Sequence, residues 1–265
     1  MTKQMKTPVS YYGGKQQLVA KILPLIPEHR TYTEPFLGGG AIFFSKEPSP
    51  VEVINDTNQE VINFYRVLKT RFKELSNAIE STLHSRKMYE DAKVVYEHSD
   101  LFDPVQRATA FYILTNQGWG SKIGSWGYDI KKNQTSKKYM NKKLQLTQEF
   151  AARLDQTQIE CTDALRVITS RDTPDTFHYC DPPYPSTNQG HYSGYSIHDF
   201  TRLLDTLSEI KGKFLLSCFP LPELDDYIER HGWHKVDIHM KKSINKGRKV
   251  EVLTANYPIA LNQAA

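Results

Sequence analysis

A chain of 265 residues, 39% of them hydrophobic and 24% charged, is long enough to bury a substantial core, which argues against a disordered protein. Its formal net charge of +4, from 34 basic and 30 acidic residues, fits a polyanionic partner only if the basic residues cluster. Residues 1–6 contain no apolar signal core, and no run of about 18 apolar residues occurs, so neither secretion nor membrane insertion is predicted. We therefore expect a cytoplasmic protein.

The first and last parts of the chain alternate short apolar runs with helical patterns. Residues 1–70 include a predicted strand at 51–54. From about residue 159 the rhythm resumes, with predicted strands at 177–180, 213–218 and 250–257 and predicted helices at 200–210 and 221–231. This alternation is typical of βα units on a parallel sheet, so we predict an α/β protein.

The middle of the chain has a different composition. It is helical and polar up to about residue 114 and then rich in Gly, Trp, Tyr and Lys up to residue 143. We interpret residues 71–154 as an inserted domain, and residues 1–70 and 155–260 as one discontinuous domain around it.

The three cysteines, Cys161, Cys180 and Cys218, each lie in an apolar stretch. Their small, odd number argues against a disulfide framework, and their spacing does not match a zinc site. We expect three buried free thiols and no metal.

A glycine-rich segment runs from Glu34-Pro35-Phe36 to Gly38-Gly39-Gly40, after a predicted strand and before a predicted helix. The glycines would let a ligand approach the backbone near the helix's N-terminal amides, a site that favours an anionic group. A tight turn alone would also explain them. The spacing is not that of the dinucleotide-binding motif.

Two further segments carry candidate ligand-binding side chains. Asp56 follows the predicted strand at 51–54, where an acidic residue can accept both ribose hydroxyls of a nucleotide. Alternatively, Asp56 or Asn58 caps the next helix. Near the start of the chain, Tyr11 and Lys15 flank a glycine turn and offer a ring and a cation; the alternative is a surface turn with a capping lysine.

The tetrapeptide Asp181-Pro182-Pro183-Tyr184 follows the predicted strand 177–180. Two prolines remove two backbone donors, so the chain must leave the sheet there as an extended turn. A carboxylate and an aromatic ring at such a position suit a flat ring that bears an amino group.

These motifs, in this order and over nearly the whole chain, resemble the Dam-type family of DNA adenine-N6 methyltransferases. Further resemblance lies in Cys161-Thr162-Asp163 and in Val250-Glu251-Val252-Leu253, which leads to Asn256-Tyr257. The resemblance implies a Rossmann-like, doubly wound, seven-stranded sheet with an inserted, mainly helical target-recognition domain. It also implies S-adenosylmethionine as cofactor, double-stranded DNA as substrate and a cognate restriction endonuclease as a partner that some relatives have.

The family mechanism assigns catalysis to Asp181, Pro182 and Tyr184. The exocyclic amine of adenine is a poor nucleophile, because its lone pair is delocalised into the ring. The Asp181 side chain and the Pro182 carbonyl would accept its two hydrogens and stabilise the charge that develops on the nitrogen. Tyr184 would stack on the adenine, which must leave the duplex to be reached.

The resemblance also predicts the cofactor site. Asp56 would hold the ribose, Phe36 and Tyr11 would contact ring or apolar surface, and Lys15 would meet the methionine carboxylate, although Tyr11 stands where we associate tryptophan with the nearest relatives. Asp163 would reach the cofactor's adenine amine or cap the helix that begins at Ala164. The full predicted set is Tyr11, Lys15, Glu34, Phe36, Gly38, Gly40, Asp56, Asp163 and Asp181.

Basic and aromatic residues interleave within the insert, where Tyr139, Lys142 and Lys143 belong to the pattern, and a DNA-binding surface is predicted there; basic residues also gather near the end of the chain. Lysines neutralise phosphates and aromatic rings can stack on bases or wedge between them, although a solvated lysine loop would have the same composition. A second basic cluster, 241–249, is predicted to lie on a loop, and Tyr192 to Tyr195 to wall the adenine pocket. The predicted DNA-binding residues are Trp119, Lys122, Trp126, Tyr128, Lys137, Lys138, Tyr195, Lys246 and Arg248.

Two alternatives stay open at this point. A cytosine-N4 methyltransferase would share the fold, but such enzymes commonly carry Ser where this chain has Asp181. A DNA-binding protein with a decayed methyltransferase fold would have lost motifs that are present here.

Overall fold

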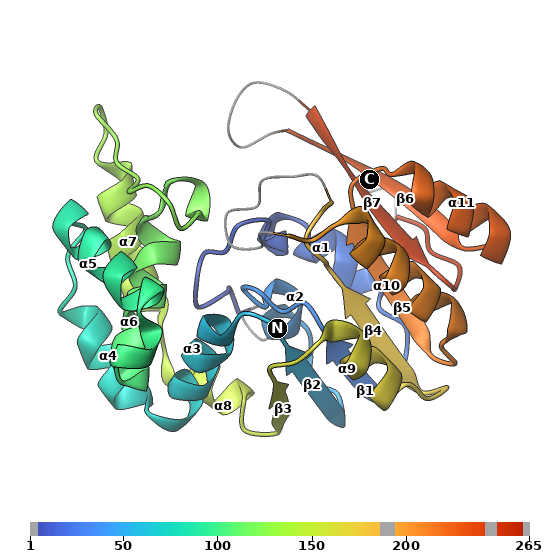
Figure 1. Cartoon of the computed structure of the whole chain (residues 1–265), viewed down its shortest axis with the longest axis horizontal. Helices are drawn as coiled ribbons and strands as arrows, with labels where there is room; N and C mark the ends of the chain where they lie inside the picture. Colours follow the sequence, from blue (N-terminus) through green and yellow to red (C-terminus); the bar gives the residue numbers. More distant parts are fainter. Residues whose placement is uncertain (1–4, 186–193, 242–247, 262–265) are drawn as a thin grey trace.

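The structure is a computed structural model, which describes residues 5–185, 194–241 and 248–261. Its centre is a seven-stranded sheet with the order β3-β2-β1-β4-β5-β7-β6 (Figure 1). The strands are β1 (Thr31–Glu34), β2 (Val51–Asn55), β3 (Thr157–Glu160), β4 (Thr176–Cys180), β5 (Lys213–Cys218), β6 (His234–Lys241) and β7 (Arg248–Ala255).

The sheet is mixed, and its strand order reverses beside β1. β1 to β5 pair in parallel, whereas β7 pairs antiparallel with both β5 and β6. From β1 the chain builds outward through β2 to β3, and it then returns to place β4 on the other side of β1. In open α/β sheets ligands bind outside the carboxyl ends of the strands at such a reversal.

Helices cover both faces of the sheet (Figure 1). One core cluster joins the sheet to α1 (Val19–Ile22), α2 (Ala41–Ser45) and α3 (Gln59–Thr70). A second cluster joins the opposite face to α9 (Ala164–Arg171), α10 (Ile197–Glu209) and α11 (Pro222–His231). Because successive side chains of a strand point to opposite faces, Tyr179 belongs to the first cluster and Cys180 to the second.

Between β2 and β3 the chain forms a helical region, on the left of Figure 1. After α3 it contains α4 (Phe72–Glu80), α5 (Arg86–Glu97), α6 (Pro104–Gln117), α7 (Gln134–Gln145) and α8 (Gln148–Arg153). Asp103 begins α6 with a capping box, in which its side chain accepts from the backbone of Gln106 and the Gln106 side chain accepts from its backbone. An ion pair of 2.5 Å between Glu60 and Arg107 links α3 to α6.

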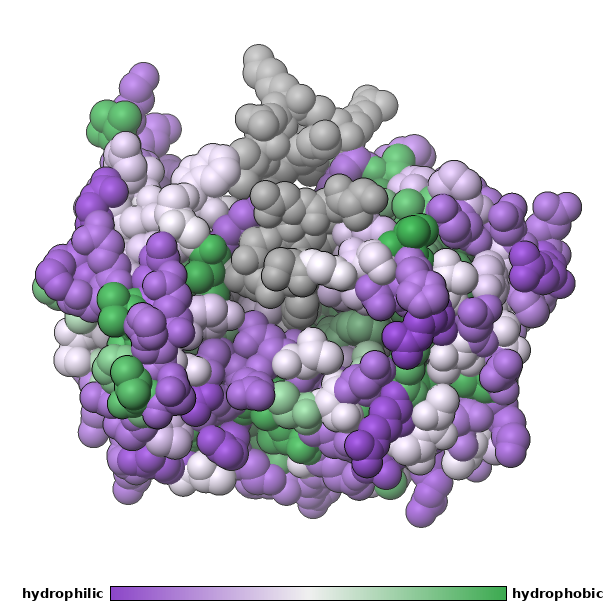
Figure 2. All heavy atoms as spheres, in the orientation of Figure 1, coloured by the Kyte–Doolittle hydropathy of each residue, from purple (hydrophilic) through white to green (hydrophobic). Residues whose placement is uncertain are grey.

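Short 3-10 helices complete the described elements: η1 (Lys15–Gln17), η2 (Leu23–Leu25), η3 (Ser99–Leu101) and η4 (Trp119–Ser121). In the described residues, no helix is long and apolar enough to cross a membrane. Figure 2 shows that hydrophilic side chains cover much of one face, with hydrophobic residues in scattered groups.

The predicted α/β class with a seven-stranded sheet is confirmed, and the predicted strands at 51–54 and 213–218 correspond to β2 and β5. Two predictions were wrong. Residues 241–249 are not simply a loop, because Lys241 ends β6 and Arg248 begins β7. Cys161 is exposed, since it follows β3, the edge strand of the sheet in the described residues; Cys180 and Cys218 are buried free thiols as predicted.

Candidate active site

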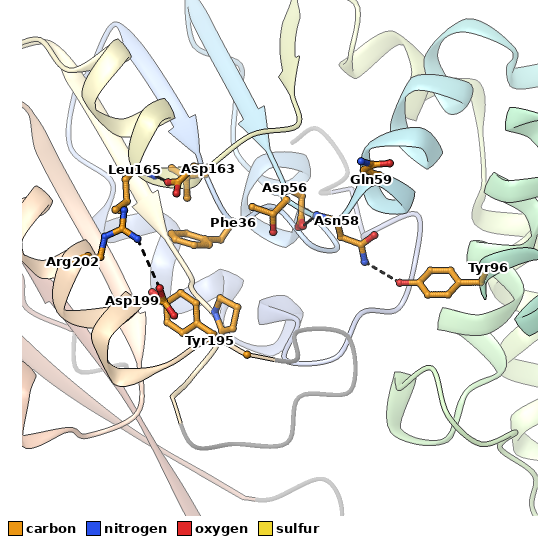
Figure 3. A pocket seen from close by; sticks show the side chains of 15 residues that line it. Phe36, Asp56, Asn58, Gln59, Tyr96, Asp163, Leu165, Tyr195, Asp199 and Arg202 are labelled. Atoms are coloured by element: carbon orange, nitrogen blue, oxygen red, sulfur yellow. Dashed lines mark hydrogen bonds and ion pairs between the residues drawn. The ribbon is translucent and has the colours of Figure 1, made fainter. Parts of the chain in front are cut away.

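A cavity of about 580 Å³ lies at the carboxyl ends of the parallel strands (Figure 3). Its walls come from the segments that follow β1, β2, β3 and β4, from the start of α10, and from Tyr96 on α5. The lining residues are Pro35, Phe36, Asp56, Thr57, Asn58, Gln59, Tyr96, Asp163, Ala164, Leu165, Pro183, Gly194, Tyr195, Asp199 and Arg202. The cavity therefore lies where the reversal of strand order predicts a ligand.

Asp56 ties the segment after β2 to the glycine segment after β1. Its Oδ2 accepts the Gly38 N–H at 2.9 Å and its Oδ1 accepts the Asn58 N–H at 2.9 Å. The cap of α3 is Asn58 instead, because its Oδ1 accepts the Glu60 N–H at 2.9 Å. Asn58 also donates to the Tyr96 hydroxyl at 3.1 Å (Figure 3). Asp56 is thus buried and lines the cavity, and it does not cap α3.

The glycine segment needs glycine for two physical reasons. Gly38 and Gly40 have φ of +48° and +65°, which favours residues without a β-carbon. A β-carbon at Gly38 would also lie 2.7 Å from Cδ1 of Tyr11. Tyr11 therefore packs on the glycine segment, and its ring also lies 6.2 Å from that of Phe111.

Asp163 and the start of α10 form the opposite wall of the cavity (Figure 3). Asp163 caps α9 by accepting the Leu165 N–H at 2.7 Å, so the capping role considered from sequence is present. Arg202 lies 3.9 Å from Asp199. Tyr195 is half-buried, and its hydroxyl has no hydrogen-bond partner in the described part of the chain.

Directly beside this cavity, the Asp181-Pro182-Pro183-Tyr184 turn forms a buried polar cluster. Lys15 Nζ lies 2.5 Å from Asp181 Oδ1 and donates to the Tyr184 hydroxyl at 2.8 Å. That hydroxyl donates to Glu251 and lies 3.4 Å from Asp181 Oδ1. Pro183 lines the cavity, so the cluster and the cavity adjoin.

The charges of this cluster depend on one another. Burial raises the pKa of Asp181 to about 6; Lys15 opposes this shift and Glu251 adds to it. Burial by itself would lower the pKa of Lys15, but the carboxylates of Asp181 and Glu251 raise it above its ordinary value. The Lys15 ammonium therefore lies between the side chains of Asp181 and Glu251.

Lys15 lies beside the Asp181 turn. Its side chain is only 6% exposed, and it is not among the residues that line the described cavity. Instead of forming a surface turn it reaches Asp181, 166 positions along the chain. Glu34 is also buried: it accepts from the Tyr32 hydroxyl at 2.6 Å, and burial raises its pKa to about 8.

Among the predicted DNA-binding residues of the insert, four are exposed to solvent and one is held by a hydrogen bond within the protein. Trp119 and Tyr128 are 52% and 57% exposed, and Lys137 and Lys138 are exposed on α7. Trp126 is held in place, because its indole N–H donates to Gln117 at 3.1 Å.

The aromatic and basic interpretation of the insert needs correction at three positions. Tyr139 is buried and contacts the hydroxyl of Thr82 at 2.5 Å, so it belongs to the core. Lys142 and Lys143 donate to backbone carbonyls, the former to Thr7 at 3.0 Å and the latter to Thr82 at 2.7 Å. These side chains pack the helical region.

Of the remaining predicted residues, Lys122 and Arg248 lie in the described part of the chain. Lys122 lies 4.3 Å from the centre of the Tyr12 ring, near the N-terminal segment. Arg248 begins β7. Lys246 and Tyr192 lie outside the described residues.

Similarity to known proteins identifies the family. The sequence profile of the D12 class N6 adenine-specific DNA methyltransferases matches residues 11–241. This chain belongs to that family. It is therefore an adenine-specific DNA methyltransferase, which confirms the predicted activity; the family implies an S-adenosylmethionine-dependent enzyme.

Individual relatives cover most of the chain. A type II methyltransferase, M1.LlaDCHI, from Lactococcus lactis subsp. cremoris is 28% identical over 92% of this chain and 93% of its own length. The DNA adenine methylase of Escherichia coli is 24% identical over 96% of both chains. Among solved structures, an rRNA methylase from Streptococcus thermophilus aligns over 89% of this chain and 93% of its own, with 10% identity and a TM-score of 0.36.

Sequence reasoning missed the residues that support the predicted ones. Glu251 and Ser217 contact the Asp181 cluster, and Tyr96, Asp199 and Arg202 line the cavity. For Glu251 a signal was present, because it is a single acidic residue among the apolar residues of a predicted strand. The others could be found only once the fold had brought distant segments together.

Proposed function

We propose that the cavity binds S-adenosylmethionine and that Asp181, Pro182 and Tyr184 present an adenine, flipped out of double-stranded DNA, for methylation at N6. One observation carries the proposal. The Asp181 carboxylate is fixed by Lys15 at 2.5 Å, and two residues later Pro183 forms part of the cavity wall. Acceptor groups for an adenine amine therefore adjoin a cavity of cofactor size.

The cavity fits the cofactor in size and chemistry. Its volume of about 580 Å³ lies within the range of roughly 300–1,000 Å³ typical of small-molecule sites. Asp56 receives two backbone N–H groups, and a carboxylate has about four lone-pair sites, so it can also accept ribose hydroxyls. Phe36 offers an apolar face and Asp163 an acceptor for the adenine amine. When bound, S-adenosylmethionine supplies the methyl group.

Glycines at positions 38 and 40 let the backbone of this segment approach the cofactor, under the ring of Tyr11. Glu34 lies buried at the end of β1 and orients this segment. Lys15 pairs with Asp181 at 2.5 Å, and we also assign it to the methionine carboxylate of the cofactor, as the family resemblance implies.

Two acceptor groups of the tetrapeptide, the Asp181 carboxylate and the Pro182 carbonyl, can serve catalysis. Asp181 Oδ1 is used by Lys15, whereas Oδ2 has no hydrogen bond to the described residues. Oδ2 and the Pro182 carbonyl accept the two amine hydrogens and stabilise positive charge on the nitrogen as it forms. The ring of Tyr184, packed 4.3 Å from that of Phe219, stacks on the adenine.

We assign target recognition to residues 71–154. Trp119 and Tyr128 are exposed rings that can contact bases, and the exposed Lys137 and Lys138 can neutralise phosphates. Trp126 stabilises this surface through its hydrogen bond to Gln117. Tyr195 walls the adenine side of the cavity. We also assign to DNA binding Lys246, which lies outside the described residues, and Arg248 at the start of β7. Similarity to a type II methyltransferase supports a cognate restriction endonuclease as a cellular partner.

The test of this assignment is the variant Asp181→Asn, which keeps the shape of the side chain and removes its charge. We expect kcat to fall by about 100- to 1,000-fold, because one preorganised partner of the reacting group is lost. The assay is mass spectrometry of N6-methyladenine after incubation with S-adenosylmethionine and mixed-sequence duplex DNA. Asp226→Asn, an exposed acid on α11, is the matched control. Wild-type turnover in Asp181→Asn would refute the assignment.

A further inference from the structure

Glu251 is a buried carboxylate on β7 whose side chain faces the Asp181 cluster. It is 1% exposed, and the strand residues on either side of it, Val250 and Val252, pack in the core cluster under α10 and α11. The alternation of the strand therefore turns Glu251 away from that cluster, to where Lys15 and the hydroxyl of Tyr184 reach it. A lone carboxylate is costly to bury unless several groups hydrogen-bond to it.

Three donors from three separate segments converge on Glu251 Oε1. The Ser217 hydroxyl on β5 donates to it at 2.7 Å, the Tyr184 hydroxyl donates to it, and Lys15 Nζ lies 3.3 Å away. Each of these donors also belongs to the region around Asp181. Glu251 thus connects the sheet, the catalytic turn and η1 at a single atom.

The same arrangement fixes the catalytic carboxylate. Lys15 lies between Asp181 at 2.5 Å and Glu251 at 3.3 Å, so its ammonium is held from both sides. Because Lys15 binds Oδ1 of Asp181, the rotation of that carboxylate is set and Oδ2 is left for another donor. Tyr184 is held at its hydroxyl, which fixes the direction of its ring axis, and its ring packs 4.3 Å from that of Phe219.

We propose that Glu251 is a positioning residue of methyl transfer: it holds Lys15 and Tyr184 so that Asp181 and the tyrosine ring meet the adenine in the reactive geometry. The proposal rests on the function proposed above. Glu251 does not touch the substrate. Its effect on turnover passes through Lys15 and Tyr184.

The electrostatic consequence gives a signature that a purely structural role would lack. Asp181 must be ionised to accept from the amine, and Glu251 helps to raise its pKa to about 6. Removal of the Glu251 charge therefore lowers the pKa of Asp181, and activity should persist to lower pH. Among the described residues, the titratable and charged groups that interact electrostatically with Asp181 are Lys15, Glu34, Tyr179, Cys180, Tyr184, Cys218 and Glu251.

The test compares Glu251→Gln with Glu229→Gln, an exposed glutamate on α11. In Glu251→Gln we expect kcat to fall by about 100-fold, because a misplacement of the order of 1 Å can have that effect. The KM for DNA and the affinity for S-adenosylmethionine should stay within about twofold of wild type, since neither is bound by Glu251. The acid limb of the kcat profile should move to lower pH, and Glu229→Gln should match wild type throughout.

Each other outcome is decisive. Wild-type kcat and an unchanged acid limb in Glu251→Gln would overturn the inference, as would a loss of cofactor affinity parallel to the loss of kcat. If Glu251→Gln does not fold, Ser217→Ala decides: it removes one donor to Glu251, and wild-type kcat in this variant would overturn the inference. Failure of the proposed function is seen separately, as absence of N6-methyladenine with the wild-type enzyme.

Discussion

The ring of Tyr11 lies so close to Gly38 that a β-carbon at position 38 would be 2.7 Å from Cδ1 of the ring. Gly38 also has φ of +48° and donates its N–H to Asp56 at 2.9 Å. One glycine therefore connects the N-terminal segment, the segment after β1 and the carboxylate after β2. The proposed cofactor site depends on all three.

Gly38→Ala should weaken S-adenosylmethionine binding and lower the free energy of unfolding by about 1–3 kcal/mol, because a non-glycine residue is strained at this φ. Isothermal titration and urea unfolding measure the two effects. Gly124→Ala is the control, since a β-carbon there meets nothing within 4 Å and φ is not positive. Wild-type affinity in Gly38→Ala would contradict the assignment of this segment to the cofactor.

Asp56→Asn should reduce cofactor affinity roughly ten- to hundredfold, since hydrogen bonds to a charged group contribute about 1.5–3 kcal/mol. The carboxylate accepts the N–H groups of Gly38 and Asn58 on separate oxygens, and an amide has only one acceptor oxygen.

The comparison variant is Asn58→Ala, which removes the cap of α3. It should lower stability by about 1 kcal/mol with a smaller change in affinity. Equal losses of affinity in the two variants would show that Asp56 acts only by holding the loop.

The strand ends of the active site could be predicted from sequence for a simple reason. Asp56 and Asp181 each follow a strand, and the carboxyl ends of parallel strands meet at one edge of a sheet. The short motif after each strand therefore predicts where the active site lies as well as which side chains it contains.

The partners of these residues could not be predicted in the same way. The contact between Lys15 and Asp181 joins residues 166 positions apart, and no local pattern specifies it. β6 was missed because polar, exposed residues interrupt it on both faces, among them His234 and Lys235, so it lacks the continuous apolar run of a central strand. Tyr139 was assigned to the surface because the lysines around it on α7 outweighed its position on the inward face.

Glu34→Gln should change stability in a pH-dependent manner. Burial raises the pKa of Glu34 in the folded protein to about 8, whereas its ordinary value is 4.5. Between these values the folded state keeps a proton that the unfolded state releases, so the contribution of Glu34 is fully present below pH 4.5 and is lost as the pH rises toward 8.

Glutamine has no such proton to lose. The free energy of unfolding of Glu34→Gln, relative to wild type, should therefore increase with pH over this window, with a slope of at most about 1.4 kcal/mol per pH unit. Urea unfolding across the window measures it, with Glu229→Gln as the control. A difference that does not vary with pH would argue against a neutral Glu34 in the folded protein.

Replacement of Lys137 and Lys138 by alanine should weaken DNA binding mainly through the phosphates. Both side chains are exposed on α7, whereas Lys142 and Lys143 donate to backbone carbonyls and are unsuited to this test. The slope of log K against log salt is negative, and each lost phosphate contact makes it shallower by about 0.9. The slope of the double variant should therefore be shallower than that of wild type by about 2. Fluorescence anisotropy with duplex DNA over a salt series measures it.

The matched control is the double alanine variant at Lys211 and Lys213, two exposed lysines at the opposite, amino end of the parallel strands. Because the cavity lies at the carboxyl ends, DNA that delivers an adenine to it should not reach this pair. The control should keep the wild-type slope and affinity. An equal loss of slope in both double variants would mean that Lys137 and Lys138 act only through the net charge of the protein, and α7 would then not contact the DNA backbone.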